Sequence, residues 1–102
     1  MSIILSVRIK SNLPFEELER RAIERRPRFK EVPGLIQKVY GKDETTGDVC
    51  GIYFFKDQAS LIDFRDSELA KSIPEAYEAI EVRREIYNVM YPLHEDRGPV
   101  SE

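Results

Sequence analysis

Apolar and polar residues alternate near both ends of the chain, and this period of two predicts β-strands. Residues 3–10 place four apolar side chains on one side, namely Ile3, Leu5, Val7 and Ile9. Residues 81–91 alternate in the same way until Pro92 ends the run. We therefore predict a first strand over residues 3–10 and a last strand over residues 81–91.

The segment between residues 32 and 56 predicts a β-hairpin. Two runs rich in β-branched and aromatic residues follow Pro33-Gly34, and a polar turn containing Gly47 separates them. A shift of one residue in the pairing would move every side chain to the opposite face. With a two- or four-residue loop, Tyr40 and Tyr53 are expected to share one face.

The segment before the hairpin has the apolar spacing of an α-helix. Phe15, Leu18, Ala22 and Phe29 form an apolar stripe after a polar segment that ends in proline. Pro27 lies within this stripe and is expected to end or kink the helix before Phe29.

A second helical segment follows the hairpin, with Asp57 as its N-cap, a restart at Ser67 and an interruption at Pro74. The order of elements is therefore β-α-β-β-α-β. Right-handed crossovers fold this order into an α+β, ferredoxin-like domain, a four-stranded antiparallel sheet with two helices on one face.

Helices can cover only one face of such a sheet, so the strand residues divide into two sets. The predicted helix-facing set is mostly apolar and consists of Leu5, Val7, Ile9, Leu35, Val39, Cys50, Ile52, Phe54, Val82, Ile86 and Met90. The outer set combines tyrosines with charged residues, a composition that suits an interface. We predict a homodimer in which the two sheets pack through Tyr40, Tyr53, Phe55, Tyr87 and Tyr91.

A few polar residues interrupt the predicted strands and are candidates for a ligand pocket. They are Gln37, Cys50, Arg84 and Asn88. Buried polar groups need partners, and a pocket between sheet and helices would supply them in the form of a small-molecule substrate. In the alternative, Arg84 pairs with a helix carboxylate and the amides bind backbone groups. Gly51, inside a strand, indicates either a bulge or the close approach of a ligand or partner.

The composition limits the partners. The 102 residues carry a net charge of −3, which argues against a nucleic-acid partner, whose binding surface would be basic. No apolar run reaches the ~20 residues that cross a bilayer, so we expect no membrane partner and a cytoplasmic location. One cysteine and one histidine, His94, give little basis for a metal site. We expect one domain over residues 1–93 and a polar tail over residues 94–102.

Several segments together resemble the YdhR-like monooxygenase family. They are Pro33-Gly34-Leu35-Ile36-Gln37-Lys38-Val39-Tyr40, Gly51-Ile52-Tyr53-Phe54-Phe55, Asp57-Gln58-Ala59-Ser60 and Tyr87-Asn88-Val89-Met90-Tyr91-Pro92-Leu93. The resemblance implies a dimeric α+β barrel related to the antibiotic-biosynthesis monooxygenases. Some of those relatives oxidise aromatic compounds with dioxygen and without metal, flavin or haem.

The leading hypothesis is therefore a cofactor-independent monooxygenase that acts on a small, aromatic substrate. In such chemistry the deprotonated substrate itself reduces dioxygen, and Arg84 is our candidate for stabilising the deprotonated form. No catalytic residue is assigned by the resemblance. Two alternatives stay open: a non-catalytic dimeric module that binds a small molecule, and an isomerase or decarboxylase on the same barrel.

Overall fold

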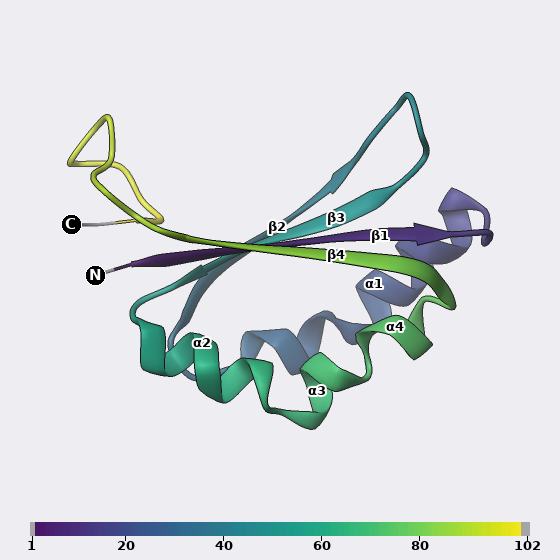
Figure 1. Cartoon of the computed structure of the whole chain (residues 1–102), viewed down its shortest axis with the longest axis horizontal. Helices are drawn as coiled ribbons and strands as arrows, with labels where there is room; N and C mark the ends of the chain where they lie inside the picture. Colours follow the sequence, from purple (N-terminus) through teal and green to yellow (C-terminus); the bar gives the residue numbers. More distant parts are fainter. Residues whose placement is uncertain (1, 101–102) are drawn as a thin grey trace.

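Four antiparallel strands form a single sheet, and all helices lie on one side of it in the computed structural model, which describes residues 2–100 (Figure 1). The elements are β1 (Ile3–Ser11), α1 (Phe15–Lys30), β2 (Leu35–Lys42), β3 (Val49–Phe55), α2 (Gln58–Arg65), α3 (Glu68–Lys71), α4 (Ile73–Ala76) and β4 (Ala79–Asn88). The strand order is β2-β3-β1-β4. The predicted ferredoxin-like α+β fold is confirmed, with the second helical segment divided into three short helices.

The helix α1 runs through Pro27 and ends at Lys30, so the expected end of this helix before Phe29 is wrong. Proline has no N–H to donate, and the helix loses one hydrogen bond at this position. The side chain of Phe29 is only 4% exposed, and its burial stabilises the last turn. Packing thus outweighs the local cost of the proline.

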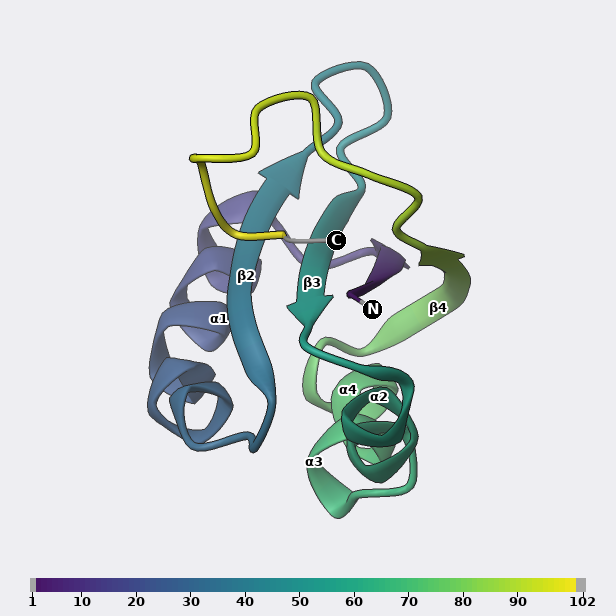
Figure 2. The same cartoon turned by 90° about the vertical axis from the view of Figure 1, so that its left-hand side faces the viewer.

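Side-chain caps begin two of the short helices. Asp57 accepts a hydrogen bond from the Ser60 backbone N–H at 2.9 Å, and Ser67 accepts one from the Ala70 N–H at 3.2 Å. Both caps were predicted from the sequence and are confirmed. Figure 2 shows that α1 lies beside β2, whereas α2, α3 and α4 lie together on the other half of the same side.

The core is centred on β1, and its predicted apolar face is confirmed. The buried residues of the core include Ile3, Leu5, Val7, Ile9, Leu18, Phe29, Tyr53, Phe55, Leu61, Phe64, Ile73 and Tyr77. The aromatic rings of this group pack in tilted pairs, with the Tyr53 and Phe64 centroids 5.2 Å apart. Such pairs add about 0.5–1.5 kcal/mol each to the stability that comes from burial.

The two faces of the hairpin are the reverse of the predicted ones. Tyr53 lies opposite Leu5 in the pairing of β3 with β1, so Tyr53 and Phe55 point toward the helices and are 2% and 0% exposed. The open face carries four residues that we assigned to the helix-facing set, namely Val39, Cys50, Ile52 and Phe54. Tyr40 and Tyr53 do share one face, but it is the helix-facing one.

The physical reason for this error is that both faces of the hairpin are apolar. Alternation within the hairpin therefore cannot decide between them, and the long-range register of β3 against β1 does. A bulge at Ile36, between Leu35 and Gln37, changes the parity within β2 as well.

Within Ala79–Asn88 the last strand keeps its predicted faces, whereas Met90, which we assigned to the helix-facing set, lies beyond the strand and is 79% exposed. Arg84 lies opposite Val7 and Asn88 opposite Ile3, so both residues belong to the helix-facing side, while Tyr87 lies opposite Ile4 on the open face. After β4 the chain passes to the side of the sheet opposite the helices (Figure 1). Within residues 2–100, no helix is long and apolar enough to cross a bilayer.

Candidate active site

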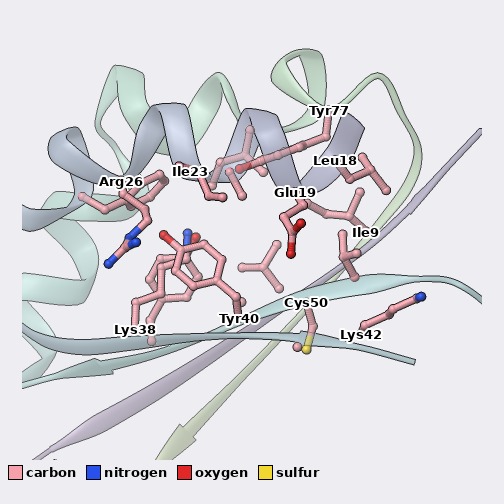
Figure 3. A pocket seen from close by; sticks show the side chains of 18 of the residues that line it. Ile9, Leu18, Glu19, Ile23, Arg26, Lys38, Tyr40, Lys42, Cys50 and Tyr77 are labelled. Carbon is pink, nitrogen blue, oxygen red and sulfur yellow. The ribbon is translucent and has the colours of Figure 1, made fainter. Parts of the chain in front are cut away.

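A cavity of about 580 Å³ lies between α1 and the β2–β3 half of the sheet (Figure 3). The strand β1 contributes Val7 and Ile9 to its wall, and Tyr77 lies at the end nearest α4. This volume falls within the range of about 300–1,000 Å³ that is usual for small-molecule sites. The cavity lies beside the aromatic cluster of the core, and Phe29 and Tyr53 belong to both.

Lys38 is the central polar group of this cavity. Its Nζ lies 3.6 Å from the centroid of the Phe29 ring, 4.4 Å from that of Tyr40 and 4.5 Å from that of Tyr53. Burial lowers the pKa of Lys38 to about 7, and the positive charge of Arg25 lowers it further in the same direction. Ring faces attract an ammonium by about 0.5–2 kcal/mol, which offsets only part of the lost hydration.

The Lys38 ammonium has no acidic counter-ion in the part of the chain between residues 2 and 100, and no carboxylate contributes to its pKa. A lysine in this setting exists as a mixture of amine and ammonium near neutral pH. It can therefore accept a proton at a pH where an exposed lysine cannot.

Gly51 provides the space that Lys38 occupies. A Cβ atom at this position would lie 2.9 Å from Lys38 Cε and 3.1 Å from Tyr53 Cε1. The sequence predicted either a bulge or a close approach at Gly51. The pairing of β3 is regular at Gly51, so the bulge is absent, and the group that lies close to Gly51 is the side chain of Lys38 rather than a ligand or a partner.

Three tyrosines border the same region, and burial raises the pKa of Tyr40, Tyr53 and Tyr77 above the usual value. Their phenol groups therefore stay protonated at neutral pH and can donate hydrogen bonds. Tyr40 is 44% exposed and lies toward the opening, whereas Tyr53 is almost fully buried. The cavity thus combines aromatic walls with hydroxyl donors.

Arg25 is a second, partly buried cation that acts on Lys38. Its Nη2 donates to Ser72 Oγ at 3.0 Å, and its guanidinium carbon lies 5.6 Å from the centroid of the Tyr77 ring. Its Nε is buried and has no hydrogen-bond partner within residues 2–100. The charge of Arg25 favours the neutral amine form of Lys38.

The structure brings two of the four predicted substrate-binding residues to the cavity. Gln37 and Cys50 border the cavity, but both belong to the open face of the sheet, Gln37 opposite Phe54 and Cys50 opposite Arg8. Arg84 and Asn88 do not line the cavity and lie exposed on β4. Figure 3 shows the Cys50 sulfur on the far side of the strand from the cavity. The Gln37 Oε1 accepts a hydrogen bond from the Lys38 backbone N–H at 3.1 Å, so this amide is occupied locally.

The five predicted interface residues are divided as well. Tyr53 and Phe55 are core residues and Tyr40 lines the cavity, so the outer-face assignment of these three residues is wrong. Tyr87 and Tyr91 are 52% and 68% exposed. The Tyr87 hydroxyl donates to Glu85 Oε2 at 2.9 Å.

Lys38 was not predicted as a site residue, because a lysine in a strand is typical of a solvent-exposed face. The signal that could have found it is Gly51, which lies diagonally across the β2–β3 pairing from Lys38. A search for metal sites over residues 2–100 finds no group of three or more potential ligands.

Residues 4–98 match the family described as "Putative mono-oxygenase ydhR". No curated protein gives a significant match to the sequence.

Among solved structures, the chain is similar to SnoaB, a cofactor-independent oxygenase from Streptomyces nogalater, with a TM-score of 0.75 at 10% identity over 90% of this chain and 96% of that one. It is also similar to Rv0793 from Mycobacterium tuberculosis, with a TM-score of 0.74 at 9% identity over 92% and 100% of the two chains. A third neighbour, a "putative antibiotic biosynthesis monooxygenase" from Deinococcus radiodurans, has a TM-score of 0.72 at 9% identity over 92% and 97%. At these identities the likeness concerns the fold.

Proposed function

This chain belongs to the ydhR mono-oxygenase family, and from that premise we propose that it catalyses cofactor-independent oxygenation of a small aromatic substrate in the cavity beneath α1. The observation that carries the proposal is the amine of Lys38, which faces three aromatic rings in a cavity and can act as a base near neutral pH. The activity of SnoaB as a cofactor-independent oxygenase supports the same reaction class.

The proposed first step is a proton transfer. The substrate carries an acidic C–H or O–H next to an aromatic ring, and the neutral amine of Lys38 takes this proton to give a carbanion or phenolate beside an ammonium. The ion pair is stronger inside the cavity than in water because the aromatic walls exclude solvent. A positioned general base of this kind contributes about 10²–10⁴-fold to the rate.

The carbanion then reduces dioxygen. One electron passes from the carbanion to dioxygen, the resulting radical and superoxide combine, and a C–O bond forms to give a peroxide anion. The Lys38 ammonium returns its proton to this anion, and loss of water leaves a carbonyl. For a methylene substrate the balance is R₂CH₂ + O₂ → R₂C=O + H₂O, with one oxygen atom in the product and one in water.

The surrounding tyrosines orient the substrate in this scheme. Tyr40 and Tyr53 keep their phenol protons, because burial raises their pKa, and can donate to a substrate oxygen that becomes anionic. Burial, together with the charge of Arg25, keeps a fraction of Lys38 in the amine form before the substrate binds. Arg84 is replaced by Lys38 as the candidate for the proton step, since Arg84 lies outside the cavity lining.

Oxygen consumption with a panel of quinol and anthrone substrates tests this function. With an anthrone, wild-type protein is expected to consume one O₂ per quinone formed and to incorporate ¹⁸O from labelled dioxygen into the product. A quinol that is only dehydrogenated to its quinone gains no ¹⁸O, and turnover of that kind alone would contradict oxygenation. Lys38→Met should abolish turnover, whereas Arg84→Ala and Lys10→Met, which alter exposed cations outside the cavity, should keep it. Turnover without oxygen would indicate the isomerase or decarboxylase, and binding without any turnover would indicate the small-molecule-binding module.

We also propose that the chain forms a homodimer through the open face of the sheet. Its apolar residues at this face include Ile4, Val39, Ile52, Phe54 and Tyr87. Val39 and Tyr87 are about half exposed in the single chain, at 47% and 52%. Light scattering at micromolar concentration tests this proposal, and a monomer there would contradict it.

A further inference from the structure

The charge of the cavity is opposite to the charge of the chain. Four cationic side chains line the cavity, Arg26, Lys30, Lys38 and Lys42, together with a single acidic one, Glu19. The whole chain has a net charge of −3. A local excess of positive charge within an acidic protein indicates that the ligand is negatively charged.

The opening of the cavity suits a flat, apolar molecule. Ile23 and Ile36 are 57% and 49% exposed at its lining, and the guanidinium of Arg26 lies at the same side in Figure 3. Exposed aliphatic side chains of this size next to a cation favour a ligand with an apolar body and an anionic group.

The interior continues this pattern. The Lys38 ammonium lies among the rings of Phe29, Tyr40 and Tyr53, so a ligand ring could pack against these faces while an oxygen attached to it meets Nζ. No carboxylate of residues 2–100 neutralises Lys38, and Arg25 adds a second positive charge behind it. Lys38 thus lacks a negatively charged partner, and an anionic oxygen of a ligand would supply one.

We infer that the cavity binds small planar aromatic acids as their anions, with an aryl carboxylate or phenolate oxygen against Lys38 and the ring between α1 and β2–β3. This inference rests on the proposed function in that both use one cavity, but it concerns binding alone. It adds the charge of the ligand and the atom that recognises it.

A change in protonation follows from this geometry. The neighbours of Lys38 are the rings of Phe29, Tyr40 and Tyr53, and the charged group that acts on it is Arg25. Glu19 also lines the cavity but makes no contribution to the pKa of Lys38, so an incoming carboxylate is the group that charges Lys38. Binding of a carboxylate above pH 7 is therefore coupled to uptake of a proton from solvent.

Calorimetry under nitrogen with 2-naphthoate, 2-naphthamide and 2-naphthol tests the inference without turnover. At about pH 8, naphthoate is expected to bind at least about tenfold more tightly than the neutral amide of the same shape. Repeating the titration in buffers of different ionisation enthalpy should give an uptake close to one proton per naphthoate. Naphthol should instead bind without net uptake and show the absorption of its anion, because its own proton passes to Lys38.

The variants separate Lys38 from other cations. Lys38→Met should remove both the preference for naphthoate and the proton uptake, and Lys10→Met, on the opposite face of the sheet, should keep both. Equal affinities for naphthoate and naphthamide, no binding of naphthoate, or a preference that persists in Lys38→Met would each overturn the inference. Binding as expected together with no oxygen consumption would contradict the proposed function only.

Discussion

On the helix-facing side of β3, one end of the strand is tightly packed and the other end borders the cavity. At one end, Phe55 is fully buried, and its ring lies 5.5 Å from the Phe64 centroid. At the other end, Gly51 has no side chain, and Lys38 occupies the space beside it. Along this face the two large rings of Phe55 and Tyr53 are followed by Gly51, which has no side chain. One face of β3 therefore contributes to the packed core at Phe55 and Tyr53 and to the cavity at Gly51.

The packed end should determine stability. Phe55→Ala removes a fully buried ring and leaves a cavity, so we expect a loss of about 3–5 kcal/mol in the free energy of unfolding. Urea denaturation followed by circular dichroism measures this loss. Phe54→Ala, one residue away on the open face, is the matched control and should lose less than half as much. Equal losses would contradict the assignment of the two faces.

The end of β3 that borders the cavity, at Gly51, should determine activity instead. Lys38→Met is expected to lower kcat by about 10²–10⁴-fold, because the base is lost. The same variant should be at least as stable as wild type at about pH 8, since it no longer buries an amine that must remain uncharged. Thermal unfolding and oxygen consumption, measured on one preparation, check both expectations. A variant that unfolds would show that Lys38 is a structural residue.

The sequence predicted the packed end better than the end that borders the cavity. The apolar face of β1 was identified because its alternation is clear, and the caps at Asp57 and Ser67 depend on local chemistry alone. The face of the hairpin was assigned wrongly, because it depends on the long-range register between β3 and β1. Lys38 was missed for the same reason: only tertiary structure shows that this lysine lies among aromatic rings.

The pH dependence should also distinguish the two ends. The folded state lowers the pKa of Lys38 from 10.5 to about 7, so above pH 7 the unfolded chain binds more protons at this residue. Stability should therefore rise with pH from about 7 to 9, by roughly 1–2 kcal/mol. Below pH 7 both states are protonated and this contribution is constant. Urea midpoints across this range should show the rise in wild type and in Phe55→Ala, but not in Lys38→Met.

The smallest effect is expected at Gly51. Gly51→Ala places a Cβ near Lys38 Cε, and the flexible lysine can move aside at a cost of about 1 kcal/mol. We expect kcat to fall about tenfold while the fold is kept. Gly41→Ala is the matched control, because its Cβ would meet Cys50 Sγ at 2.9 Å on the opposite face of the hairpin. A similar loss of kcat in both variants would argue for a general effect on the hairpin.

The protonation of Lys38 is the most direct test of this account. An NMR titration of protein labelled with ¹³C at lysine Cε, with Lys38→Met to assign the signal, gives the pKa of this residue in the folded chain. We predict a midpoint near 7 for Lys38. A midpoint for Lys38 within the range of exposed lysines, at about 10.4, would contradict the role of this amine as a base in the cavity.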